Sequence, residues 1–74
     1  MMARFFFHIR DGATFVPDEV GRDLPDLEGV KTEAAHSARE LREQVDLFVS
    51  ETPRIEVHDH AGNLIMIMPV YVQH

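Results

Sequence analysis

A chain of 74 residues forms one domain, residues 1–74, and buries too small a fraction of its surface to be more than marginally stable. It has no cysteine, which excludes disulfides and a thiolate zinc site. With 13 acidic and 7 basic residues the net charge is −6, which disfavours nucleic acid as a partner because binding phosphates normally needs a basic patch. Apolar packing, a partner or self-association must therefore supply the stability.

No segment indicates a membrane role. The longest apolar run, residues 64–72, is far shorter than the ~20 residues that span a bilayer. The N-terminus has neither the apolar stretch nor the small-residue cleavage site of a signal peptide. The sequence therefore predicts a cytoplasmic protein.

The first part of the chain has the pattern of a β-hairpin. Residues 4–10 alternate with period two and are rich in aromatic side chains, which predicts a strand. Asp11-Gly12 predicts a hairpin turn, since glycine readily takes a positive φ. Residues 13–16 return as a second strand, and Pro17, which cannot donate a ladder hydrogen bond, places that strand at an edge of the sheet.

A long amphipathic helix is predicted over residues 26–49. Asp26 is a suitable N-cap because its carboxylate can accept hydrogen bonds from the free N–H groups of the first turn. Apolar residues recur at three- and four-residue steps and form one stripe on the helix, which is typical of a helix that lies on a core. The stripe consists of Leu27, Val30, Ala34, Ala38, Leu41, Val45, Phe48 and Val49.

Two further strands follow the helix. Residues 54–59 alternate apolar and polar side chains, residues 59–63 form a turn, and residues 64–68 are apolar at every position. A strand that is apolar on both sides is normally covered on both faces. One helix covers only one of them, so we expect a partner on the other.

The predicted fold class is α+β: a four-stranded β-β-α-β-β sheet with one helix packed on one face. The two most apolar strands, residues 4–10 and 64–68, are expected at the centre and parallel to each other. With strands numbered along the chain this gives the order 2-1-4-3. The predicted core consists of Phe7, Ile9, Ala38, Leu41, Val45, Ile55 and Val57.

Three histidines are candidate metal ligands. His58 and His60 lie two residues apart, and His8 of the first strand could complete a site for zinc or nickel. Ordinary strand and turn positions explain all three better. The acidic residues before the helix also lack the ordered spacing of a calcium loop. We therefore expect no metal and no cofactor.

The inventory for catalysis is poor. The chain has no cysteine nucleophile, and neither Ser37 nor Ser50 has the glycine context of a nucleophile elbow. The glycines are isolated and form no phosphate-binding loop. We assign no catalytic residue and expect no enzyme.

One face of the sheet is the predicted interface. Arg4, Phe6, His8 and Arg10 share one face of the first strand. Basic residues interleaved with an aromatic one can stack RNA bases, but only one aromatic is present and the protein is acidic. A protein interface, most simply a homodimer, is the favoured interpretation. The candidate interface residues are Arg4, Phe6, His8 and Arg10 of this strand, joined by Met66 and Met68 of the fourth strand.

The order of several motifs resembles an uncharacterised bacterial family of short stand-alone proteins, a domain of unknown function. The motifs are Phe5 to Gly12, Asp18 to Gly21 with Leu24 to Glu28, and Ile55 to Asp59 with Gly62 and a Leu-Ile-x-Ile-x-Pro ending. The chain departs from that family at Gly29, where alanine is usual, and at His60, where an acidic residue is usual. The resemblance implies no activity, cofactor or catalytic residue.

A looser likeness to HicB-type antitoxins rests on the hairpin, the acidic loop ending at Leu24-Pro25 and the helix that follows. It implies an antitoxin-like regulator, but the DNA-binding segment usual in such antitoxins does not follow the fourth strand here. The sequence thus predicts a small cytoplasmic binding or interaction module, with an antitoxin-like or RNA-binding regulator as the alternative.

Overall fold

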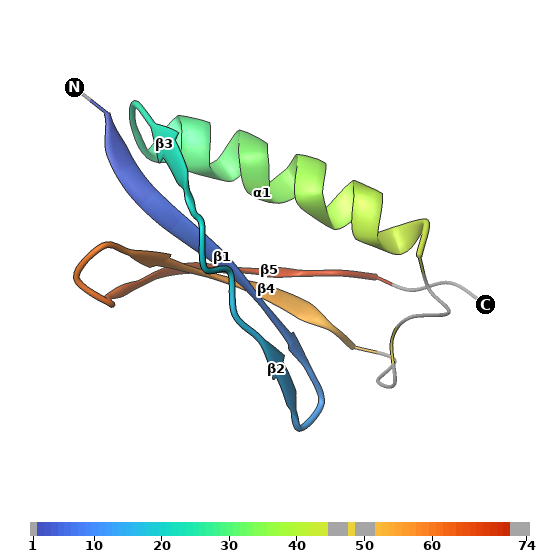
Figure 1. Ribbon diagram of the computed structural model, residues 1–74. Helices are drawn as coiled ribbons and strands as arrows, with labels where there is room; N and C mark the ends of the chain where they lie inside the picture. The colour runs from blue at the N-terminus through green and yellow to red at the C-terminus, as the bar shows by residue number, and fades with distance from the viewer. Residues whose placement is uncertain (1, 45–47, 49–51, 72–74) are drawn as a thin grey trace.

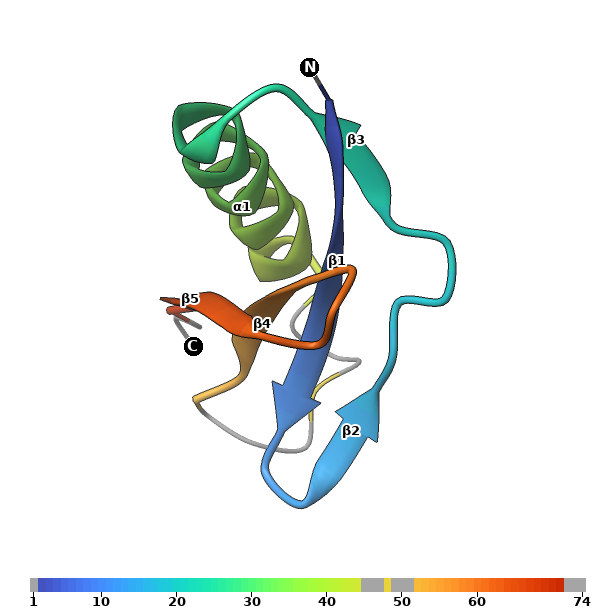
Figure 2. The ribbon, with the colours of Figure 1, turned by 90° about the vertical axis from the view of Figure 1, so that its left-hand side faces the viewer.

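The computed structural model describes residues 2–44, 48 and 52–71. One helix lies on one face of a five-stranded sheet (Figures 1 and 2), so the predicted α+β class is confirmed. The described residues contain no helix with the length and apolar character needed to cross a membrane. The elements are β1 (Ala3–Asp11), β2 (Thr14–Val16), β3 (Arg22–Leu24), α1 (Leu27–Arg42), β4 (Arg54–Asp59) and β5 (Leu64–Pro69).

The order of the strands in the sheet differs from the predicted order. The path is β2-β1-β4-β5, and every neighbouring pair is antiparallel. The expected order, with residues 64–68 at the centre and parallel to the first strand, is wrong. β4 is central because the carboxylate of its Glu56, although buried, is paired with Arg10 and Arg54 and so costs little to place there. A four-residue turn then holds β5 beside β4 as the edge strand.

β3 is the strand that the sequence did not predict. It pairs antiparallel with the first part of β1, where Phe5 lies opposite Arg22, while β2 pairs with the last part of β1. Both short strands therefore lie along the same edge of β1 (Figure 2). Three residues are too few to show a period-two pattern, and they follow a loop rich in turn-forming residues.

The helix begins as predicted and ends earlier. Asp26 is the N-cap, and its Oδ1 accepts the Gly29 N–H at 2.8 Å. The helix ends at Arg42, where the Glu43 N–H bonds back to the carbonyl of Glu40 in a tighter turn. The prediction of a helix to residue 49 is thus wrong at Phe48, which is described and is not helical. Val45 and Val49 lie outside the described residues.

The core lies between the helix and the middle of the sheet. Its buried members are Val30, Ala34, Ala38, Ile55, Val57 and Val70. Phe7 and Leu41 pack against them and are half-buried, as is Ile9. Of the predicted core, only Val45 lies outside the described residues.

Candidate functional site

Four rings gather on the face of the sheet that the helix leaves open. Phe6 and His8 of β1 stack with centroids 6.3 Å apart and planes 7° from parallel. His8 also contacts the Phe15 ring at 5.3 Å and the His58 ring at 4.9 Å. We call Phe6, His8, Phe15 and His58 the ring cluster. Phe15 is 40% exposed and the other three are half-buried, so the cluster is a surface and not a core.

His8 is the centre of the ring cluster, and its contacts favour the neutral imidazole. The backbone N–H of Asp18 donates to its Nδ1 at 2.9 Å, which requires that nitrogen to be unprotonated. Burial and the neighbouring His58 lower the pKa of His8 below 6.5, against the opposing effect of Asp18 and Glu56. His8 therefore favours the neutral form.

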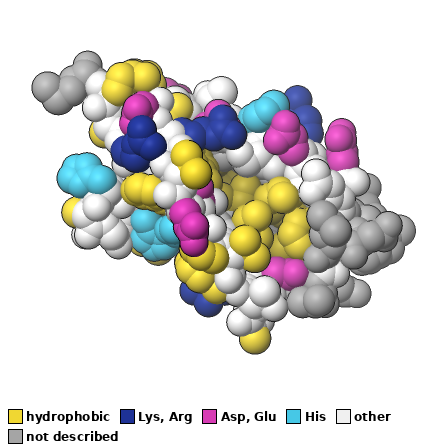
Figure 3. All heavy atoms as spheres, viewed as in Figure 1, with side chains coloured by type: hydrophobic (Ala, Val, Ile, Leu, Met, Phe, Trp, Pro, Cys, Tyr) yellow, Lys and Arg dark blue, Asp and Glu magenta, His cyan; other side chains and the backbone are white. Residues whose placement is uncertain are grey.

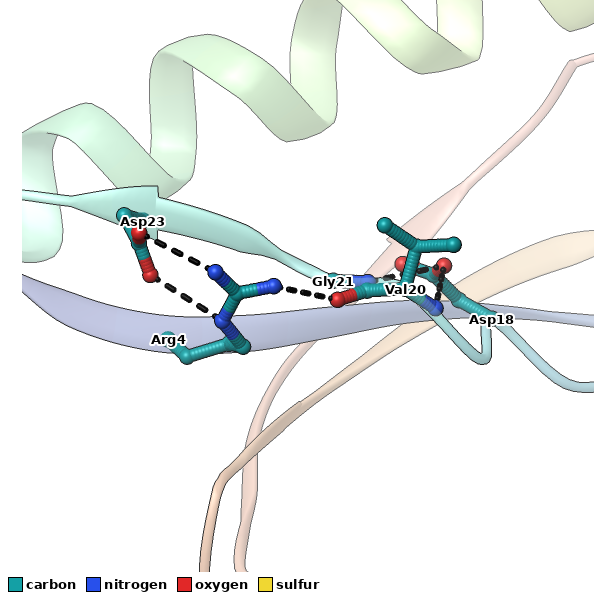
Figure 4. Close-up of polar contacts among 5 residues, drawn as sticks. All are labelled: Arg4, Asp18, Val20, Gly21 and Asp23. Atoms are coloured by element: carbon teal, nitrogen blue, oxygen red, sulfur yellow. Dashed lines mark hydrogen bonds and ion pairs between the residues drawn. The ribbon is translucent and has the colours of Figure 1, made fainter.

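Asp18 takes the place of a strand partner between β2 and β3. Its Oδ2 accepts the N–H of Phe7 at 3.0 Å, the β1 amide that neither short strand reaches. Its Oδ1 accepts the N–H groups of Val20 at 3.2 Å and Gly21 at 3.1 Å (Figure 4). Burial acts to raise the pKa of the Asp18 carboxyl, but these donors outweigh it and lower the pKa below 3.8.

Arg4 of β1 also holds the loop of residues 18–21, which precedes β3. Its guanidinium donates to the Val20 carbonyl at 2.6 Å and forms an ion pair with Asp23 at 3.1 Å (Figure 4). Gly21 lies between these contacts with φ +75°, and an added Cβ would lie 2.9 Å from the Phe5 carbonyl oxygen. The loop thus lies against β1 in a position that only glycine fits.

An ionic group occupies the other end of the open face. Glu56 Oε2 accepts from Arg54 Nε at 3.1 Å and from Arg10 Nε at 3.4 Å. Burial would raise the pKa of Glu56, but the two guanidinium groups lower it overall. Arg10 also lies over the Phe15 ring, 4.5 Å from its centroid. Arg4, Arg10 and Arg54 are therefore all paired within the chain.

The predicted interface residues divide between the two faces. Arg4, Phe6, His8 and Arg10 occupy the open face as expected. Met66 and Met68 do not, because they lie opposite Val57 and Ile55 and pack on the core beneath the helix. The structure therefore does not bring them together with Phe6.

A register shift between β4 and β5 determines which β5 side chains lie on the open face, and the sequence pattern does not reveal it. Val57 lies opposite Met66 but His58 lies opposite Leu64, which makes Ile65 an extra residue. Leu64 and Ile67 consequently share the open face with His58 and Glu56, and they are 53% and 48% exposed. The alternation of side chains between the two faces of the sheet, from which the face of each β5 residue would be predicted, is therefore interrupted at Ile65.

The three candidate metal ligands are not brought together. His8 and His58 are adjacent, whereas His60 lies exposed in the turn after β4. Among the described residues no group of three histidine, aspartate or glutamate side chains could hold a metal ion. The Asp59 carboxylate instead bonds the turn itself, accepting from Ala61 N at 2.9 Å and Asn63 N at 2.8 Å.

A groove on the helix side was not predicted. It lies between α1 and the β1–β2 end of the sheet, where Phe7, Ile9, Val16, Leu41 and Ile55 line a space of about 540 Å³. Hydrophobic side chains gather in a hollow beside the helix (Figure 3).

No curated protein and no solved structure matches this chain. One family model does, and it is described as Domain of unknown function (DUF6894). Its match runs from residue 4 to residue 71, which includes the helix, the whole ring cluster and all of the strands except Ala3, the first residue of β1. The chain therefore belongs to the DUF6894 family.

Proposed function

We propose that this chain is a protein-interaction module that self-associates through the side of the sheet the helix leaves uncovered. One observation carries the proposal: large apolar side chains remain exposed there on two strands, β2 and β5. Phe15 is 40% exposed, Leu64 53% and Ile67 48%. Small soluble proteins seldom leave such a surface uncovered unless it binds something.

The character of this surface favours protein over nucleic acid. An RNA-binding sheet needs unpaired basic side chains near its stacking rings. Here Arg4 is paired with Asp23, and Arg10 and Arg54 share Glu56. The rings that remain, with apolar residues beside them and paired charges around them, resemble the centre and rim of a protein interface.

Sedimentation analysis of the parent and of Phe6→Glu across micromolar concentrations tests the proposal. We expect a parent whose mean mass rises with concentration towards twice that of the monomer, and a Phe6→Glu variant that stays monomeric. The matched control is Leu27→Glu, which adds the same charge at a 51% exposed apolar position on the helix. It should associate like the parent.

A parent that is monomeric at every concentration would contradict self-association. Loss of association in Leu27→Glu as well would show that added charge, and not the open face, is responsible. Salt-dependent binding of RNA by the parent, lost in Arg4→Ala, would instead support the regulator alternative.

A further inference from the structure

We infer that two copies join by antiparallel pairing of their β5 strands about a two-fold axis at Ile67. This inference rests on the proposed self-association and places a contact between copies at the edge of the sheet, which leaves the open face of each copy uncovered. The two sheets would become one, with both helices on one side. The two open faces would then lie side by side as a single surface.

The first argument is that β5 is the long open edge of the sheet. Among the described residues no segment pairs with its outer side. The opposite edge consists of β2 and β3, which have three residues each, and the amide between them is bonded to Asp18. Short edge strands offer little to pair with, whereas six residues of apolar edge are a template for another strand.

The second argument is the direction of the main-chain groups. Val70 N–H donates to the Pro53 carbonyl at 2.9 Å, which makes Val70 and Pro53 a hydrogen-bonded pair. Because such pairs alternate in an antiparallel ladder, Met66 and Met68 direct their groups to β4. Ile67 and Pro69 direct theirs outward. Pro69 has no N–H. From Met66 to Pro69, therefore, only Ile67 can both donate and accept a main-chain hydrogen bond with a strand on the outer side of β5.

This constraint sets the register. A hydrogen-bonded pair across the new seam must contain Ile67, and a two-fold axis can place it opposite its own copy. Met66 of one copy then lies beside Met68 of the other on the helix side. The seam is apolar on both faces.

The third argument identifies the occupant as a second copy. The chain carries a net charge of −6, so two copies repel each other over most of their surfaces. Residues 64–72 contain no charged side chain at all. This strip is where two acidic copies can approach without opposing charges, and an antiparallel two-fold arrangement makes it complementary to itself.

Cysteine cross-linking tests the geometry, and the absence of native cysteine makes the result unambiguous. In the inferred dimer the two Cα atoms at position 67 lie ~5.5 Å apart, within disulfide range. Those at position 64 lie ~20 Å apart, because six residues separate them along the strands. Ile67→Cys should therefore oxidise to a covalent dimer, and Leu64→Cys should not, although Leu64 is equally exposed.

A second pair of variants tests the N–H of Ile67. Ile67→Pro removes this donor, which β4 does not use, so the monomer should fold with an unchanged circular dichroism spectrum. The dimer dissociation constant should rise at least about tenfold, since both copies lose the bond. Ile67→Val shortens the side chain but keeps the N–H and should dimerise like the parent.

The outcomes separate this inference from the proposed function. A dimeric parent with equal cross-linking at positions 64 and 67, or with association unchanged in Ile67→Pro, overturns β5 pairing and leaves the open face as the interface. A monomeric parent overturns both. Cross-linking at 67 together with weakened association in Ile67→Pro supports β5 pairing; association unchanged in Phe6→Glu would then show that the edge strand, and not the open face, joins the copies.

Discussion

The two faces of the sheet are held by different forces. Beneath the helix, Ile55 and Val57 are 1% and 0% exposed and belong to the apolar core. On the open face, directly across the same strand, Glu56 and His58 lie among paired charges and aromatic rings. One face is stabilised by the volume of apolar side chains that it removes from water, and the other by directed contacts.

This difference has a measurable consequence. A face stabilised by burial should respond to the loss of volume and be indifferent to pH between 5 and 8. A face stabilised by hydrogen bonds to titratable groups should respond to geometry and to pH. The variants below are ordered by the size of the effect we expect.

The largest effect should come from Ile55→Ala. Removing a fully buried side chain leaves a cavity under the helix and should lower the free energy of unfolding by ~2–5 kcal/mol. Ile67→Ala on the other face should cost under ~1 kcal/mol, since half of that side chain is exposed. Urea denaturation at micromolar concentrations measures both; equal losses would show that the open face is also core.

The second effect concerns the loop against Phe6. Gly21→Ala forces a side chain into a positive φ and against the Phe5 carbonyl, and should cost about 2–3 kcal/mol. Gly62→Ala is the matched control: its φ is +87° but nothing lies within 4 Å of an added Cβ. The control should cost only about 1–2 kcal/mol. Thermal denaturation measures both variants. If Gly21→Ala and Gly62→Ala lower the melting temperature equally, the loop around Gly21 is free to move away from β1.

The third effect is that of Asp18→Asn, which keeps the shape and removes the charge. At pH 7 we expect a loss of ~1–2 kcal/mol because three backbone donors lose a carboxylate acceptor. The folded-state pKa of Asp18 is below 3.8, so its contribution is present above that value and is lost as pH falls through the folded pKa. Denaturation of the parent and of Asp18→Asn at pH 7 and at pH 2.5 should show a smaller difference in their free energies of unfolding at the lower pH. A difference that stays constant would contradict this role.

The smallest effect is the titration of His8. Its folded-state pKa is below 6.5, so the unfolded chain binds the proton more readily. Stability from the Asp18 N–H bond to Nδ1 is present above pH 6.5 and declines as pH falls below it. His8→Phe keeps the ring and should flatten this dependence. Nuclear magnetic resonance titration of the His8 ring measures the pKa directly, and a value above 6.5 would contradict the assignment.

Much of the fold follows from local pattern. The strands at residues 4–10 and 54–59 alternate, Asp26 caps the helix, and the turns at Gly12 and Gly62 have positive φ as their residues favour. Each of these signals depends on a few neighbouring residues and on backbone chemistry. Such features can be predicted because nothing distant competes with them.

The strand order and the assignment of faces depend on distant partners. Apolar content placed residues 64–68 at the centre, whereas β4 takes that place once Arg10 and Arg54 neutralise Glu56. The shift at Leu64 moved Met66 and Met68 to the helix side, and a register shift leaves no mark on composition. The role of Asp18 does not follow from the sequence pattern around it, because its partner Phe7 lies in a strand eleven residues earlier.

Asp18 also has a consequence for how copies of this chain can assemble. A molecule with one open edge can pair once and is then complete, but a molecule with two open edges can add copies without limit. The Asp18 carboxylate occupies the stretch of β1 that would otherwise be the second edge. A substitution that removes this acceptor would therefore do more than destabilise the fold: we expect it to free the Phe7 N–H and make that edge of the sheet more open to pairing with another strand.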